Sequence, residues 1–79
     1  MQEINVRVQS FQDVRAISAL AAKEEFQILV SDGHRTVNAK SLMGIFTLNM
    51  GKPLVLQLDC SEETCEAFRV KAGRFLADE

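Results

Sequence analysis

Ser41 and Lys40 are the two residues whose types and spacing most directly indicate chemistry. They stand in the stretch NAKSLMGIFTL, residues 38–48, where a hydroxyl precedes a run of apolar residues. A serine at the start of a helix caps it by accepting a hydrogen bond from a first-turn amide. A phosphate group is also favoured there, because the positive end of the helix dipole and the neighbouring lysine attract negative charge. We predict that Ser41 is a helix cap and a candidate for phosphorylation.

Asp13 and Arg15, in DVRA (residues 13–16), form a second candidate group. Ser10 and Asp13 have the spacing of a capping box, which predicts a helix start and a structural role for the aspartate. An acyl-phosphate carrier and a solvated surface acid are the alternatives for Asp13. Arg15 follows the helix start, where a guanidinium either binds an anion or lies on a solvated face.

The remaining candidates are the histidine and the two cysteines. His34 follows an Asp-Gly pair, which predicts a turn residue, with a phosphoacceptor or metal-ligand role as the alternative. Cys60 and Cys65 lack the C-x-x-C spacing and histidine neighbours of redox and zinc sites, so we expect reduced, partly buried thiols. We therefore expect no metal, no cofactor and no catalytic residues, and thus no enzyme.

Length and charge limit the classes of protein to which the chain can belong. Its 79 residues predict a single domain over 1–79, since a chain of this size supports only one small core. Nine Lys and Arg against eleven Asp and Glu give a net charge of −2, which argues against nucleic-acid binding. No apolar run reaches the roughly 18 residues needed to cross a bilayer. We expect a cytoplasmic protein that does not bind membranes.

The hydrophobic pattern predicts alternating strands and helices. Residues 4–9 alternate as a strand does, residues 10–23 have helical spacing, and residues 26–30 and 36–39 flank the Asp-Gly hairpin signal. We expect Ser41 to begin a short helix that Gly51 ends, residues 53–59 to form a strand, and Asp59 or Ser61 to cap a last helix. The order βαββαβα predicts an α+β open-faced sandwich, in which a mostly antiparallel four-stranded sheet is covered on one face by helices.

In this element order, and in the stretch DGHRTVNAKSLMGIFTL, the chain resembles the HPr family. These are the histidine-containing phosphocarrier proteins of the bacterial sugar phosphotransferase system. The resemblance implies a sheet of order 1-4-2-3 and a regulatory phosphorylation site for an HPr-type serine kinase at Ser41. It also implies a partner-binding surface at Lys40, Leu42, Met43 and Phe46. If Leu42, Ile45 and Leu48 face the core, Met43 and Phe46 point outward.

The same resemblance exposes a departure from the family. The H-x-R-P motif that carries the phosphoacceptor histidine corresponds here to DVRA, with Asp13 at the histidine position and Ala16 at the proline position. An imidazole forms a phosphoramidate that transfers readily, and a carboxylate in a capping box offers no such chemistry. We therefore predict a divergent HPr-like protein that acts as a non-catalytic regulatory or protein-binding module.

Two other functions stay open. One is an active phosphocarrier with an altered acceptor, Asp13 or His34. The other is an HPr fold recruited to unrelated partners, including a homodimer formed through Met43 and Phe46. The expected partners are proteins, either components of the phosphotransferase system or a serine kinase.

Overall fold

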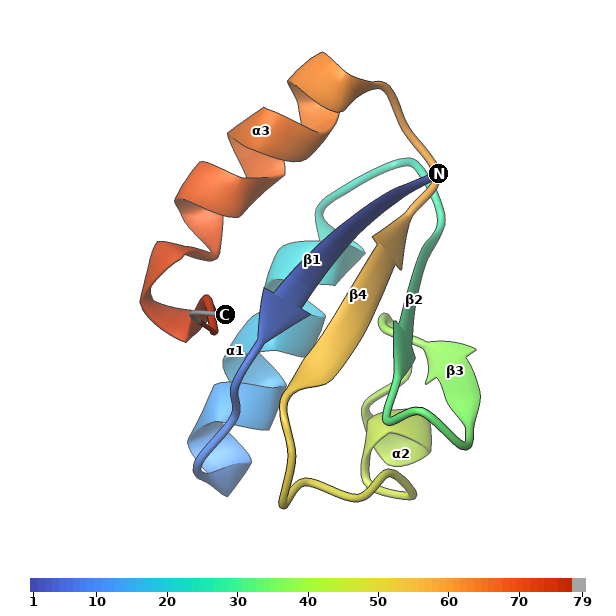
Figure 1. The fold of residues 1–79 in the computed structure, drawn as a ribbon, viewed down its shortest axis with the longest axis vertical. Helices are drawn as coiled ribbons and strands as arrows, with labels where there is room; N and C mark the ends of the chain where they lie inside the picture. Colours follow the sequence, from blue (N-terminus) through green and yellow to red (C-terminus); the bar gives the residue numbers. More distant parts are fainter. Residues whose placement is uncertain (78–79) are drawn as a thin grey trace.

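Strands and helices alternate along the chain in the predicted order. In the computed structural model, which describes residues 1–77, the elements are β1 (Gln2–Val6), α1 (Phe11–Ala22), β2 (Ile28–Ser31), β3 (Thr36–Asn38), α2 (Leu42–Ile45), β4 (Leu54–Leu58), α3 (Glu62–Lys71) and a 3₁₀ turn, η1 (Gly73–Phe75) (Figure 1). Residues 78 and 79, which the predicted 1–79 domain includes, lie outside the described residues.

The four strands form one antiparallel sheet in the order β1-β4-β2-β3, as predicted. The middle strand β4 pairs on both sides, so that Leu56 lies opposite Ile4 on β1 and Val30 on β2. Because side chains alternate across a strand, this register places all three on the same face. The α+β class and the sheet order are confirmed.

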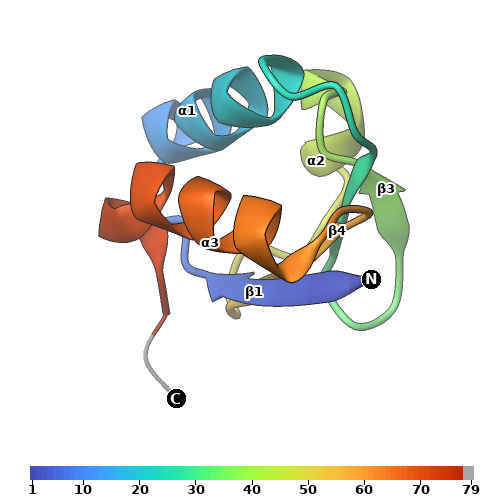
Figure 2. The same cartoon turned by 90° about the horizontal axis from the view of Figure 1, so that it is seen from above.

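All three helices cover that apolar face, and Figure 2 shows them on the same side of the sheet. The fully buried large side chains come from every strand of the sheet except β3 and from α3, and they are Phe68, Ile4, Ile28, Leu54, Leu56, Leu58, Val6 and Val30. No helix of residues 1–77 lies on the other face of the sheet. The single core therefore lies between the sheet and the helices, as an open-faced sandwich requires.

Helix α1 begins where the capping box predicts. The Ser10 hydroxyl accepts a hydrogen bond from the Asp13 amide at 3.2 Å, and the Asp13 carboxylate accepts one from the Gln9 amide at 3.0 Å. Val14, Ile17 and Ala21 are buried at helical spacing. Phe11 has the same spacing but is 58% exposed, because it lies at the outer end of the apolar stripe.

Helix α2 is shorter than the sequence predicts. It ends at Ile45, and Gly51 does not end it, since Gly33 is the one glycine of positive φ among residues 1–77. The Thr47 hydroxyl donates to the Gly44 carbonyl at 2.7 Å, and the Thr47 amide also bonds that carbonyl. A side-chain bond of this kind competes with the continuing helical ladder, so the following residues form an irregular loop.

Helix α3 is capped by Ser61, one of the two caps that the sequence predicts, and ends at Lys71. Cys60 directly precedes the Ser61 cap, and Cys65 lies in the second turn of the helix. These are the two positions of a hydrophobic staple. After Lys71 the chain tightens into η1, which still buries Phe75. Leu76 then bridges Val6 of β1, and this bridge shields an edge of the sheet.

Candidate functional site

Ser41 is an exposed N-cap of α2. Its hydroxyl accepts a hydrogen bond from the Gly44 amide at 3.2 Å, as the sequence predicts. A Cβ at Gly44 would lie only 3.3 Å from the Ser41 oxygen, so a residue without a side chain suits the close approach. The hydroxyl is thus both structurally engaged and open to solvent.

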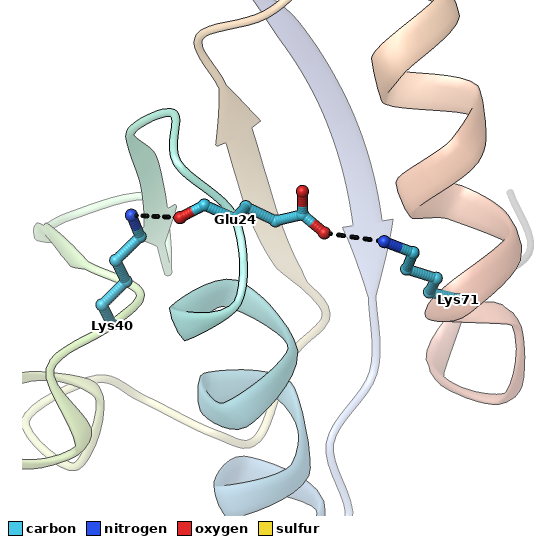
Figure 3. Close-up of polar contacts among 3 residues, drawn as sticks. All are labelled: Glu24, Lys40 and Lys71. Atoms are coloured by element: carbon cyan, nitrogen blue, oxygen red, sulfur yellow. Dashed lines mark hydrogen bonds and ion pairs between the residues drawn. The ribbon is translucent and has the colours of Figure 1, made fainter.

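Lys40 holds two parts of the fold together. Its ammonium donates to the Glu24 carbonyl oxygen at 2.8 Å, just after α1 ends (Figure 3). The Glu24 carboxylate in turn pairs with Lys71 of α3 at 3.0 Å. Lys40 is therefore a structural link between the segment that precedes α2 and the end of α1, an arrangement the sequence did not indicate.

Beside Ser41, three exposed apolar side chains form what we call the aromatic patch: Phe11, Met43 and Phe46. Met43 is 77% exposed and Phe46 is 38% exposed, as the helical spacing of α2 predicts. The rings of Phe11 and Phe46 stack with centroids 5.0 Å apart and planes 7° from parallel. Leu42 is partly buried against the core, so it contributes less to this surface.

The stacked rings border a groove of about 390 Å³. Its lining comes from the loop after β1, the first turns of α1 and the α2 region, and includes Val8, Val14 and Met50. The helical spacing of residues 10–23 includes Phe11 and did not single it out as a surface residue. Its position directly after the cap was the signal that it could extend past the core.

Asp13 and Arg15 lie in the first turns of α1 and make different contacts. Asp13 is a half-buried member of the capping box, with its carboxylate bonded to the Gln9 amide. Arg15 is exposed, and its guanidinium carbon lies 5.9 Å from the centre of the Phe11 ring. That distance is within the range of a cation–π interaction, so Arg15 borders the aromatic patch.

His34 lies in the β2–β3 hairpin, where its amide donates to the Asp32 carboxylate at 2.9 Å. Asn49, His34 and Arg35 each donate a backbone N–H to that carboxylate, and these bonds hold the pKa of Asp32 well below its usual range. Asp32 thus fastens the loop after α2 to the hairpin. His34 itself is an exposed turn residue.

The described residues offer little for metal or thiol chemistry. No group of three or more His, Cys, Asp and Glu side chains placed to hold a metal ion occurs within residues 1–77. Both cysteines are free, and burial raises the pKa of the Cys60 and Cys65 thiols, which disfavours the reactive thiolate. Across that same part of the chain, every helix is too short or too polar to span a membrane.

Solved structures of similar architecture include HPr proteins. The chain superposes on an HPr-C-His from Thermoanaerobacter tengcongensis with a TM-score of 0.72 and 24% identity, over 100% of this chain and 99% of the other. The chain has the HPr fold.

Two more HPr structures agree. The phosphocarrier protein HPr from Bacillus anthracis str. Ames gives a TM-score of 0.64 at 25% identity, over 87% of this chain and 90% of that one. The histidine-containing phosphocarrier protein of a Mycoplasma gives 0.63 at 11% identity, over 96% and 98%. No protein-family model and no curated protein sequence matches the chain. The protein is therefore a divergent, HPr-like one.

The cap of this HPr-like chain at Ser41 makes a stability prediction. We expect Ser41→Asp to leave the free energy of unfolding within about 1 kcal/mol of the parent, because aspartate is itself a good N-cap and its charge suits the helix dipole. Ser41→Leu should cost roughly 1 kcal/mol, since it leaves the Gly44 amide without its acceptor. Urea denaturation of the three proteins measures both values. Equal stability of the leucine variant and the parent would contradict the capping role.

Proposed function

We propose that this HPr-like protein is a non-catalytic regulatory or protein-binding module of the bacterial cytoplasm, related to the sugar phosphotransferase system. The observation that carries the proposal is the aromatic patch. In it, the Phe11 and Phe46 rings stack on each other and line an apolar groove. Exposed aromatic and methionine side chains beside a groove are typical of the centre of protein interfaces.

The energetics of the patch favour a protein partner. Two aromatic rings that already stack have lost much of their freedom before binding, so less entropy is lost when a partner covers them. Met43 adds a flexible apolar side chain that adapts to the partner's surface. Arg15 at the border can form hydrogen bonds with an acceptor on the partner.

The absence of phosphotransfer is part of the proposal. The Mycoplasma neighbour is named a histidine-containing phosphocarrier protein, and the family resemblance implies that this histidine is the phosphoacceptor. By resemblance, Asp13 occupies the corresponding position here, and its carboxylate already accepts the Gln9 amide in the capping box. This capping hydrogen bond supports a structural role for the Asp13 carboxylate and not a role as phosphate carrier.

Partners and regulation follow from the same surface. Components of the phosphotransferase system are the first candidates, and an HPr-type serine kinase is a candidate for Ser41, whose hydroxyl is solvent-exposed beside the patch. Lys40 and Leu42 would then act mainly by holding α2 in place.

Two alternatives remain and lead to different experimental results. One is a carrier that accepts phosphate on Asp13 or on the exposed His34. The other is a fold recruited to unrelated partners, with a homodimer through Met43 and Phe46 as its simplest form. Sedimentation of the pure protein tests the homodimer directly.

A double substitution in the patch tests the proposal. The test partner is Enzyme I, the phosphotransferase-system component from which HPr proteins take phosphate. Met43→Ser with Phe46→Ser should weaken binding to the host's Enzyme I at least about thirtyfold in a calorimetric titration, because interface aromatics commonly contribute about 2 kcal/mol or more. The unfolding midpoint should change little, since both side chains are exposed.

Val70→Ser is the matched control, because Val70 is 79% exposed on α3, away from the patch. It should leave the affinity for Enzyme I unchanged. If the double variant binds as tightly as the parent, or the parent does not bind at all, the patch is not an interface for this partner.

A further inference from the structure

A second, polar pocket lies next to the apolar groove and shares only Gln9 with it. It has a volume of about 320 Å³ and lies between the loop after β1, the first turn of α1 and the η1 turn. Its lining includes Arg7, Asp13 and Arg74, with Phe75 and Leu76. Two guanidinium groups in one pocket of an acidic protein are unusual enough to need an explanation.

Neither arginine has an ionic partner within residues 1–77. The ion pairs of the described chain join Arg69 to Glu66 and Lys71 to Glu24, and no side-chain hydrogen bond of that part of the chain involves Arg7 or Arg74. Asp13 lines the same pocket, but its carboxylate is engaged by the Gln9 amide and lies beyond ion-pair distance of both arginines. Among residues 1–77, no side chain therefore accepts a hydrogen bond or ion pair from either guanidinium group.

A backbone hydrogen bond fixes the main chain at Arg7, and an aromatic ring lies beside the Arg74 guanidinium. The Arg7 amide donates to the Phe75 carbonyl at 2.7 Å, which joins the end of β1 to the η1 turn. The Arg74 guanidinium carbon lies 4.4 Å from the centre of the Phe75 ring. Stacking occupies a face of the guanidinium and leaves its in-plane N–H groups directed outward, where they can form hydrogen bonds.

We propose that this pocket binds one oxyanion, a carboxylate or a phosphate group, through Arg7 and Arg74. Arginine binds either group through paired N–H donors, and its charge persists at every physiological pH. The Gln9 side chain can add a neutral donor. The site is separate from the aromatic patch and does not depend on the proposed function.

Asp13 makes the assignment easy to test, because it reduces the positive charge of the pocket. With two arginines and one carboxylate the pocket carries a net charge of +1. Removing the carboxylate charge should strengthen anion binding, whereas removing an arginine should weaken it. Asp13→Asn keeps a side-chain oxygen for the Gln9 amide, so the helix cap is retained.

The experiment is a titration of the labelled protein with inorganic phosphate and, in a separate arm, with acetate, followed by two-dimensional NMR at constant ionic strength. We expect saturable shifts of the Arg7 and Arg74 side-chain N–H signals. Arg74→Gln should weaken binding at least about tenfold, since a charge-assisted pair is lost. Asp13→Asn should tighten it about two- to fivefold, as expected for removal of one nearby like charge. Saturation by phosphate alone assigns a phosphate group, and saturation by both assigns a general oxyanion site.

Arg35→Gln is the matched control, because Arg35 is an exposed arginine in the hairpin at the opposite edge of the sheet. It changes the net charge by the same amount and should leave the affinity within about twofold. The terminal Asp78→Asn, Glu79→Gln variant should bind at least as tightly as the parent, because it only removes negative charge. Shifts that do not saturate, equal effects of the Arg74 and Arg35 substitutions, or weaker binding by the Asp13 or terminal variant would overturn the proposal.

Discussion

Phe75→Ala is expected to lower the free energy of unfolding by about 3–5 kcal/mol, the usual cost of removing a large aromatic side chain from a core. Phe75 is only 5% exposed, although it lies in the short η1 turn and not in a helix. The substitution also removes the ring on which the Arg74 guanidinium stacks. Chemical denaturation of parent and variant gives the difference.

Val70→Ala provides the comparison for this measurement. Its side chain also comes from the C-terminal part of the chain but is 79% exposed, so we expect a change within about 0.5 kcal/mol. A loss below 1 kcal/mol for Phe75→Ala would show that η1 does not pack on the sheet. It would also remove the floor of the proposed oxyanion pocket.

Incubation with Enzyme I and labelled phosphoenolpyruvate is expected to leave the parent protein without label. Asp13 corresponds by resemblance to the histidine position, and its carboxylate serves the helix cap. The single change Asp13→His should also fail to give efficient transfer, because Ala16 stands in place of the family's proline. Acid-labile radioactivity on the protein is the measurement.

The two results separate the possible functions. Robust labelling of the parent would overturn the non-catalytic proposal, and substitution of His34 would then show whether that residue is the acceptor. Efficient labelling of the Asp13→His protein alone would show that the acceptor is the one missing part. An authentic HPr in the same assay controls for active Enzyme I.

The sequence was sufficient to predict the elements and their order. Strand residues such as Ile4 and Leu56 alternate, helix residues such as Val14 and Ile17 recur at helical spacing, and Ser10, Ser41 and Ser61 provide the caps. These signals are local, because alternation, helical periodicity and capping depend on neighbours within a few residues. The outward direction of Met43 and Phe46 followed from the same periodicity.

Only the tertiary structure decided which residues meet. The stack of Phe11 on Phe46, the bond from Lys40 to Glu24, and the pocket shared by Arg7 and Arg74 each join residues that are far apart in the sequence. Likewise, Asp32 holds Asn49 and so draws the loop after α2 toward the hairpin, away from the helical course that Gly51 suggested. Such contacts depend on how the helices pack across the sheet, and local patterns carry no information about that packing.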